Sequence, residues 1–550
     1  MNTWFKSGLP WVWLNAGAVA ISLILVVGLL ALIASRGLGY FWPDPVMVAD
    51  YKAPEQQALK VAGAIIRSEV VPIKYLRAAD INTENLPETV NRSLLQTGTG
   101  GLTDINYVWL IKPWLHKIRY PTDILTIERQ ENSNFHGYLK SVKENGATVA
   151  NGKQAFPELV NRIERTKNIY KAIEDIQRHH IVEINEKLEQ LRLKKRRQEL
   201  NNTFSHTQEQ TTDTQQAQFK HQYQQYTYKL NQLYKALSRD SYTILTADGT
   251  LIEQPVSNIV RAYHPNNLSI TEKIALYFNK LGEFLLESPR EANSKGGIFP
   301  AIFGTIMMVI LMSIFVTPFG VITAVYLHEY AQQGTITRIV RIAVNNLAGV
   351  PSIVYGIFGL GFLVYFVGGN IDKLFFPEAL PAPTFGTPGL LWASITLSIL
   401  TLPVVIVATE EGLSQIPTSI REGSLSLGAT RAETLWHVVL PMASPAMITG
   451  LILAIARAAG EVAPLMLVGV AKLVPNLPVD SSYPFIHLDQ KFMHLAYHIY
   501  DFGFQSPDVE TSRSLVYATA LLLILIIVTL NFSAVVLRNH LREKYKRLES

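Results

Sequence analysis

An arginine and a glutamate stand four residues apart within a long apolar part of the chain. They are Arg457 and Glu461, in the sequence Ile455-Ala-Arg-Ala-Ala-Gly-Glu-Val-Ala-Pro464. On a helix this spacing places both side chains on one face, close enough to pair. A lone charge inside a membrane costs on the order of 3 kcal/mol or more, so such charges pair and face an interior or a water-filled path. We predict an ion pair on one helix of a membrane span. It forms either part of a passage for an anion, to which a guanidinium offers a fork of donors, or a contact that fixes helix packing.

A polar segment from Glu422 to Pro441 is the second feature with a recognisable pattern. It reads E-G-S-L-S-L-G-A-T-R-A-E-T-L-W-H-V-V-L-P and lies between two long apolar runs. Because glycine takes the left-handed cap conformation at little cost, we expect a helix from about Ile420 to Leu427 to stop at Gly428. The spacing from Thr430 to Glu433 predicts a capping box that begins a second helix, and Pro441 is expected to end it. The segment therefore predicts a helix-turn-helix that lies at the membrane surface and docks into a cleft on a soluble partner. The alternative is an ordinary polar loop that contains a helix break.

The chain lacks the residues that several other kinds of chemistry require. The chain has no cysteine, which excludes thiol catalysis, cysteine-ligated zinc and disulfides. It has no Walker A pattern to hold ATP phosphates, so we expect no enzyme activity and no cofactor in this chain, with energy supplied by a partner. The formal net charge of +5, without a basic groove interleaved with aromatics, argues against nucleic-acid binding. His494 and His498 stand at helical spacing in an outer loop, and we expect surface residues there rather than metal ligands.

The composition is that of a membrane protein with a large soluble part. The 550 residues are 48% hydrophobic and only 17% charged, and the mean hydropathy is +0.16. Such a mild average in a long chain indicates apolar spans diluted by a polar domain. Length and apolarity predict six membrane spans, at about Trp11 to Ala34, Phe299 to Leu327, Ala343 to Val367, Leu390 to Thr409, Ala446 to Val470 and Leu515 to Leu537.

Basic residues predict the orientation of these spans. Arg338 and Arg341 lie in a short link between spans, and a basic tail follows Leu537. Positive residues favour the cytoplasm, so we expect both termini and the Glu422 loop there, and residues 36–296 outside. The expected domains are residues 1–35 with the first span, the outer insert 36–296, a core 297–537 with the loop 411–441, and the tail 538–550.

The outer insert carries both strand and helix patterns. Tyr107 to Ile111, Asp123 to Ile127 and Tyr242 to Thr246 are typical of strands, with a hairpin turn at Glu144 to Ala147. Apolar residues at helical spacing predict two long helices over about 157–238, joined by a flexible tip at Asn201 to Gln218. We therefore predict a small α+β domain interrupted by a coiled-coil hairpin; the alternative is two amphipathic helices in an ordinary α+β core. A run of four basic residues from Lys194 to Arg197 is interpreted as a solvated helix face.

The polar segment resembles the cytoplasmic loop of ABC-transporter import permeases, which has the form E-A-A-x3-G-x9-I-x-L-P. Two alanines and the isoleucine of that form are replaced here by small or similar residues. The resemblance implies a role in coupling to an ATPase for these positions: Glu422, Gly423, Ser424, Gly428, Val438, Leu440 and Pro441.

Further sequence segments resemble the PstA family of phosphate-import permeases. They are Gly297-Ile-Phe-Pro-Ala-Ile-Phe-Gly-Thr305, Tyr326-Leu-His-Glu-Tyr-Ala331, Asn345-Asn-Leu-Ala-Gly-Val-Pro-Ser-Ile-Val-Tyr-Gly356 and the residues around Arg457. The resemblance covers about 297–537 and implies a mostly α, MetI-like permease core in a bacterial inner membrane. It also implies passage of phosphate near Arg457 and Glu461.

The same resemblance implies partners that this chain does not contain. They are a second permease (PstC), a dimer of an ATPase (PstB) that holds ATP and Mg²⁺, and a periplasmic phosphate-binding protein (PstS). The outer insert departs from the family pattern. Two rival functions remain: a permease for another oxyanion such as sulfate or molybdate, and a membrane sensor or scaffold that uses the outer arm.

Overall fold

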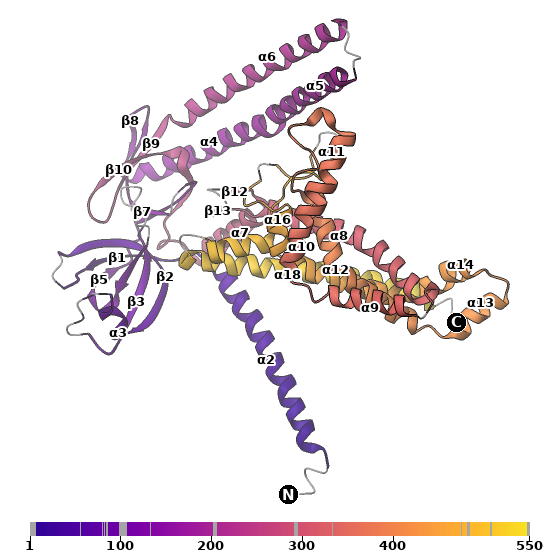
Figure 1. Cartoon of the computed structure of the whole chain (residues 1–550). Helices are drawn as coiled ribbons and strands as arrows, with labels where there is room; N and C mark the ends of the chain where they lie inside the picture. The colour runs from indigo at the N-terminus through magenta and orange to yellow at the C-terminus, as the bar shows by residue number, and fades with distance from the viewer. Residues whose placement is uncertain are drawn as a thin grey trace. The chain divides into compact units, whose positions relative to one another are not determined.

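The computed structural model divides the chain into two compact units (Figure 1). One unit comprises Met1–Tyr40 and Ile298–Ser550, and the other comprises Phe41–Gly297. We call them the membrane unit and the insert unit, and each is described by itself. The structure describes residues 7–54, 57–79, 81, 83, 86–97, 107–131, 134–201, 206–290, 295–332, 334–474, 476–480, 485–505 and 509–546.

The membrane unit is helical. Among the described residues, six helical stretches are long and apolar enough to cross a membrane: Pro10–Gly39, Phe299–Tyr330, Ser352–Phe375, Leu390–Ser414, Arg431–Gly460 and Ser512–His540. This confirms the predicted class, a mostly α protein with six membrane spans. The longer helices of the unit are α2 (Leu9–Gly39), α8 (Phe299–Val325), α9 (Thr335–Leu347), α12 (Leu390–Ser414), α15 (Leu440–Gly460) and α18 (Val509–Lys546).

Shorter helical segments join and extend them. They are η6 (Tyr326–Tyr330), α10 (Ser352–Phe358), η7 (Gly359–Gly368), α11 (Gly369–Phe375), η8 (Pro377–Ala379), α13 (Thr418–Ser426), α14 (Arg431–Thr434), η9 (Leu435–Val439), α16 (Ala463–Val468), α17 (Leu495–Tyr500) and η10 (Asp501–Gln505). Of these, η6, η7, η9 and η10 are π-helical, with a wider turn than an α-helix.

Helix α12 lies at the centre of the membrane unit, packed against α8 and α15. Its Leu397 and Val405 are fully buried in one apolar cluster with Met308 of α8 and Ala458 of α15. Small residues bring the helices together, and a Cβ built on Gly450 of α15 would lie 2.7 Å from Ala408 Cβ. This close approach is typical of membrane helices, which associate by packing of small side chains rather than by a hydrophobic driving force.

The third span begins later than predicted. The expected start at Ala343 is wrong, because α9 is a separate helix that ends at Leu347 and the span begins at Ser352. Pro351 supplies the break, since proline has no N–H and disfavours a helical conformation in the residue before it. The Tyr355 hydroxyl donates to the Leu347 carbonyl oxygen at 2.5 Å and ties the two helices across the break.

The described residues of the insert unit form two large antiparallel sheets and a small one, in which β12 pairs with β13. A five-stranded sheet has the order β4-β3-β2-β1-β5, and a six-stranded sheet has the order β10-β9-β7-β6-β11 with β8 paired to β7. The strands are β1 (Val46–Tyr51), β2 (Leu59–Pro72), β3 (Thr89–Gln96), β4 (Tyr107–Ile111), β5 (Leu115–Arg119), β6 (Leu125–Arg129), β7 (Phe135–Glu144), β8 (Ala147–Asn151), β9 (Asp240–Leu245), β10 (Leu251–Pro255), β11 (Ile259–Tyr263), β12 (Pro289–Arg290) and β13 (Lys295–Gly296). The predicted α+β character of the insert is confirmed.

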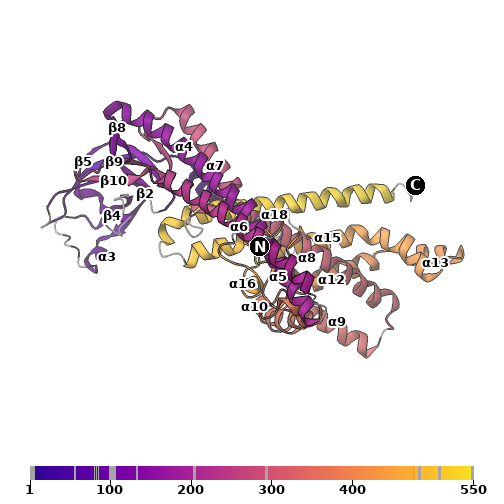
Figure 2. The ribbon, with the colours of Figure 1, turned by 90° about the horizontal axis from the view of Figure 1, so that it is seen from above.

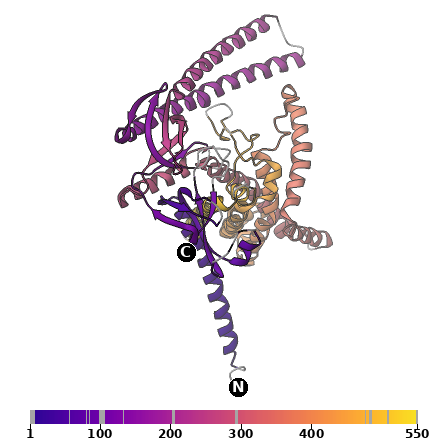
Figure 3. The same cartoon turned by 90° about the vertical axis from the view of Figure 1, so that its left-hand side faces the viewer.

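Two long helices leave the second sheet and return to it. The helical elements of the insert unit are α3 (Ile73–Arg77), η1 (Lys112–Trp114), η2 (Gly152–Gln154), α4 (Ala155–Asp175), η3 (Ile176–Ile181), α5 (Val182–Leu200), α6 (His206–Leu237), η4 (Val256–Asn258) and α7 (Ile270–Leu286). Figures 1 and 3 show α5 and α6 side by side as a hairpin, which we call the arm. The predicted flexible tip over Asn201 to Gln218 is wrong from His206 onward, because α6 is already helical there; residues 202–205 lie outside the described residues.

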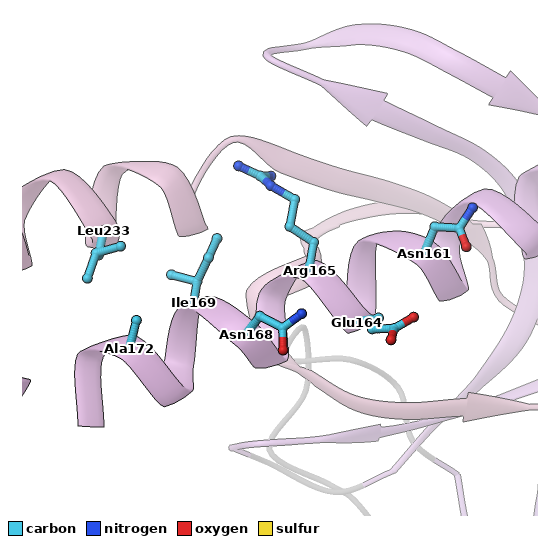
Figure 4. A pocket seen from close by; sticks show the side chains of 7 residues that line it. All are labelled: Asn161, Glu164, Arg165, Asn168, Ile169, Ala172 and Leu233. Atoms are coloured by element: carbon cyan, nitrogen blue, oxygen red, sulfur yellow. The ribbon is translucent and has the colours of Figure 1, made fainter. Parts of the chain in front are cut away.

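Charged groups fix the root of the arm to the sheet. Asp240 of β9 is buried and accepts hydrogen bonds from Arg162 and Arg165 of α4 and from Arg239. Burial opposes ionisation of Asp240, but these arginines outweigh it and lower its pKa. Figure 4 shows Leu233 of α6 lying across from α4 at the same root, beside a hollow of about 520 Å³. Ionic and apolar contacts together therefore hold the arm at its base.

Candidate functional site

The polar loop forms two short helices separated by a glycine turn. Helix α13 ends at Ser426, and Gly428 has a φ of 91°, in the region that favours glycine. The Thr430 hydroxyl accepts from the Glu433 amide at 3.2 Å, while the Glu433 carboxylate accepts from the Thr430 amide at 2.8 Å. The helix break and the capping box are therefore present, as predicted from the local sequence. Both Figures 1 and 2 place α13 at one end of the group formed by α12 and α15.

Pro441 does not end the second helix, contrary to prediction. The helical stretch Arg431–Gly460 is continuous, and Pro441 lies in the first turn of α15. The π-helical segment η9 comes directly before it. A π-helix has a wider turn, and helices take up a proline where the local ladder of hydrogen bonds is already altered. The loop therefore leads without interruption into the fifth span.

One side of the loop packs against the ends of the spans. Leu413, Ile416, Leu435 and Val439 are buried in one apolar cluster with Val325 of α8. The two loop helices are tied to each other, since the hydroxyl oxygens of Ser424 and Thr434 lie 2.9 Å apart. This contact gives a physical reason for a small residue at position 424. Val438, Leu440 and Pro441 are half-buried and belong to the same inner side.

The other side of the loop is exposed and apolar. Leu427 is 91% exposed and Trp436 is 69% exposed. Glu422, Gly423, Leu425 and Gly428 are exposed as well, and a Cβ built on either glycine would meet nothing within 4 Å. We call the exposed side the docking face: Glu422, Gly423, Leu425, Leu427, Gly428 and Trp436. Large apolar residues on an exposed loop indicate an interaction site for another protein.

Arg457 and Glu461 are brought together at the C-terminal end of α15. Arg457 Nε lies 3.6 Å from Glu461 Oε1, and the side chains are 35% and 20% exposed. The prediction that both lie on one helix is wrong, because α15 ends at Gly460 and Glu461 has an extended backbone with φ −76° and ψ 135°. The helix resumes only at Ala463 as α16. The charged pair therefore lies at the C-terminal end of the candidate span Arg431–Gly460, where the helix stops and both side chains are partly exposed.

The break is held from behind by the third span. A Cβ built on Gly356 of α10 would lie 2.7 Å from Pro464 Cα, so only glycine fits at that contact. Ala458 and Ala459 beside Arg457 are fully buried and belong to the central cluster. The Arg457 guanidinium is also close enough to Tyr355 to interact with it electrostatically. Packing of small residues thus fixes the backbone that presents the pair.

His494 and His498 are not surface residues, contrary to expectation. Both are buried, and burial lowers the pKa of each to about 3, so both rings are neutral. The segment is buried because it packs on the first turns of α8, where the Leu495 amide donates to Thr305 Oγ1 at 3.0 Å. Within the described part of the chain, no group of three or more metal-ligating side chains could hold a metal ion.

Sequence reasoning missed three residues of the loop region. Leu427 and Trp436 on the docking face were visible as apolar residues in a polar segment, but neither belongs to the loop pattern. Arg421 carries no local signal, because its carboxylate partner Glu329 is 92 residues away in the sequence.

Comparisons with known proteins agree with this architecture. Residues 316–547 match a protein family described as the binding-protein-dependent transport system inner membrane component. The chain is 32% identical over 197 residues to the probable ABC transporter permease protein YqgH of Bacillus subtilis (strain 168), which covers 36% of this chain and 60% of that protein. It is 32% identical over 245 residues to the phosphate transport system permease protein PstA 1 of Mycobacterium tuberculosis (strain CDC 1551 / Oshkosh), which covers 44% of this chain and 71% of that protein.

The structure is also similar to a chain of the MetNI methionine ABC transporter in an inward-facing conformation, at 18% identity and a TM-score of 0.33, covering 44% of this chain and 94% of that chain. The insert unit, Phe41–Gly297, lies outside the residues matched by the transport-system description. The sequence relatives carry the assignment. With 32% identity to a PstA protein over 71% of that protein's length, the chain belongs to the binding-protein-dependent ABC transporter permeases and is a PstA-like member of that family.

Proposed function

We propose that this ABC importer permease subunit carries inorganic phosphate. The observation that supports this most is the Arg457–Glu461 pair, which lies where the helix of the fifth candidate span ends and is partly exposed. A guanidinium matches the oxygens of phosphate with two parallel donors. Glu461 competes for the same guanidinium, so an anion is bound weakly enough to leave again, as a conduction path requires. The similarity to PstA 1 supports phosphate as that anion.

The energy for transport comes from partner subunits in this proposal. The docking face presents Leu427 and Trp436 to an ATPase, and its inner side is packed on the ends of α8, α12 and α15. Closure of the ATPases around ATP pushes the loop, and the loop moves the spans on which it is packed. A partner permease completes the path, and a phosphate-loaded binding protein delivers substrate from outside. These partners are expected to be PstC, PstB and PstS.

Basic residues support the orientation that this proposal needs. Arg338 and Arg341 on α9, and the C-terminal part of α18 with Arg538, favour the cytoplasmic side. Six crossings then place both termini and the loop in the cytoplasm, and the insert unit outside in the periplasm. The insert unit is proposed as a periplasmic domain whose arm has a role of its own, such as holding the binding protein.

Sulfate or molybdate is the second candidate substrate, because each of these oxyanions also fits a guanidinium fork. Labelled phosphate uptake separates the candidates in cells that lack this chain, with and without its re-expression. We expect re-expression to restore uptake that an excess of sulfate or molybdate does not reduce. If sulfate or molybdate reduced this uptake, the competing oxyanion rather than phosphate would be identified as the substrate. Uptake that does not depend on this chain would contradict the proposal.

The role of the charged pair is tested by two variants at one position. Arg457→Gln removes the charge, and Arg457→Lys keeps the charge but not the fork. We expect Arg457→Gln to lower phosphate flux about tenfold or more while the complex still assembles, with an intermediate flux for Arg457→Lys. Unchanged flux in Arg457→Gln would reduce Arg457 to a packing residue.

A further inference from the structure

Arg421 ties the loop to two membrane spans at once. Its Nη2 atom donates to Glu329 Oε1 at 3.0 Å and to the Leu413 carbonyl oxygen at 2.8 Å, and Nη1 donates to the Ile416 carbonyl oxygen at 3.1 Å. Arg421 is on α13, Leu413 is in the last turn of α12, and Glu329 is on η6 at the end of the second span. The side chain is only 18% exposed. One guanidinium therefore joins three helical elements.

Two of the three acceptors are backbone carbonyl oxygens, one in the last turn of α12 and one two residues beyond its end. The last carbonyl groups of a helix have no intrahelical donor, and the helix dipole makes that end negative. The Arg421 guanidinium at the end of α12 donates hydrogen bonds to these carbonyl groups, and its positive charge lies at the negative end of the helix dipole. Its planar fork holds several acceptors in fixed directions, which a lysine cannot do. Glu329 completes the set with a charge-assisted bond.

A second arginine, on helix α9, contacts the same end of the second span. Arg341 of α9 donates to the Leu327 carbonyl oxygen at 3.0 Å, and its Nε lies 3.5 Å from Glu410 Oε1 on α12. His328 Nδ1 lies 3.0 Å from Glu329 Oε1. The π-helical segment η6 is thus held between α9, α12 and α13 by charged contacts. These contacts link the end of the second span directly to its neighbouring helices.

Arg421 also stands next to the docking face. It precedes Glu422 in the same helix, so the two side chains point about 100° apart, one inward and one outward. Glu422 is exposed, whereas Arg421 is directed into the spans. Arg421 therefore adds a charged connection from α13 to α12 and η6, beside the apolar cluster that packs the loop on the ends of the spans.

We propose that Arg421 is a positioning residue that transmits movement of the loop to the second and fourth spans, through Glu329 and the end of α12. The proposal rests on the proposed function, because it assumes that a partner ATPase moves the loop. It assigns to Arg421 no contact with substrate. Its consequence is that loss of Arg421 uncouples ATP hydrolysis from transport without loss of the complex.

The test compares Arg421→Met, Glu329→Gln and the double variant in the full complex. The matched control is Arg338→Met, which removes an exposed arginine from α9. The quantity measured is phosphate moved per ATP hydrolysed, with co-purification of the ATPase as a check on assembly. A residue needed only for assembly lowers both activities together and leaves this ratio unchanged.

We expect Arg421→Met to lower the ratio about tenfold, since several charge-assisted bonds are lost together. Glu329→Gln should lower it less, and the double variant should be no worse than Arg421→Met, because both changes remove one connection. The control should keep the wild-type ratio. An unchanged ratio in Arg421→Met, or a double variant with the product of two independent effects, would overturn the proposal.

A second measurement does not depend on the substrate. The chain has no cysteine, so Ser426→Cys gives a single site for a spin label on α13. Arg421→Met should increase the mobility of this label, and Arg338→Met should not. If the wild-type complex moved no phosphate but the label responded in this way, the proposal of phosphate transport would be wrong. The anchoring role of Arg421 would still be supported. Equal mobility in wild type and Arg421→Met would overturn the anchoring role itself.

Discussion

Replacement of two glycines in one loop by alanine should have opposite effects. Gly423 and Gly428 are both exposed, and a Cβ on either would meet nothing within 4 Å. Steric contact therefore does not distinguish them. Gly423 lies within α13, whereas Gly428 has a φ of 91°. Only the backbone conformation separates the two positions.

The backbone difference sets the magnitude. An L-residue in the left-handed region costs roughly 1–2 kcal/mol, so Gly428→Ala should lower the equilibrium ratio of the native turn to other conformations by about 5- to 30-fold. In the interior of a helix, alanine is favoured over glycine by up to about 1 kcal/mol, so Gly423→Ala should be neutral or stabilising. Gly428→Asn should be milder than Gly428→Ala, because asparagine tolerates positive φ better than most residues.

Binding of the purified permease to its ATPase measures the effect. When only the native turn binds, the apparent Kd rises by the factor by which its population falls. We expect a higher Kd for Gly428→Ala, by up to about 5- to 30-fold, and no increase for Gly423→Ala. Wild-type affinity in Gly428→Ala would refute the role of the glycine turn. Equal loss in both variants would show that any added methyl group on the docking face interferes.

Three further predictions follow from exposed and buried groups. Trp436→Ala should weaken ATPase binding by about 2 kcal/mol, because an exposed tryptophan in a docking face is typical of an interface hot spot. Asp240→Asn should destabilise the insert unit by about 1–3 kcal/mol, since it removes charge-assisted hydrogen bonds to three arginines, although Arg162 keeps its contacts with Glu144 and Glu158. Burial, with a smaller effect of Arg129, lowers the pKa of His136 to about 4. The unfolded chain therefore takes up this proton first, and the insert unit should lose stability as the pH falls from about 6.5 to about 4.

Matched variants check these three predictions. His437→Ala removes an exposed neighbour of Trp436 and should leave ATPase binding unchanged. Limited proteolysis of the purified chain reports the stability of the insert unit, and Asp175→Asn, an exposed acid on α4, is the control for Asp240→Asn. His136→Leu should flatten the pH dependence of proteolysis. Wild-type protection in Asp240→Asn, or an unchanged pH profile in His136→Leu, would contradict the corresponding prediction.

Local rules in the sequence predicted the features whose partners are close in the chain. The capping box between Thr430 and Glu433 and the turn at Gly428 depend on neighbours within a few residues. Strand β4 at Tyr107–Ile111 matches its predicted range for the same reason. The membrane spans were predicted because their signal is length and apolarity alone.

Features that depend on distant contacts were missed or misplaced. Strands β1 to β3 form one sheet, in which β1 also pairs with β5, more than 60 residues away, and the ranges of these strands were not predicted. The burial of His494 depends on the first turns of α8, about 190 residues away, as the Leu495–Thr305 hydrogen bond shows. The break after Gly460 lies in an apolar run that reads as one helix, and only packing of Gly356 on Pro464 reveals the separate segment α16.

The central claim is that phosphate crosses the membrane past Arg457, driven by ATP on partner subunits. Its most direct test is ATP-dependent accumulation of labelled phosphate in proteoliposomes that contain this chain with its partner permease, ATPase and binding protein. We predict accumulation that requires ATP and the binding protein, and that falls about tenfold or more in Arg457→Gln with the complex intact. Accumulation by the Arg457→Gln complex at the wild-type rate would contradict the account.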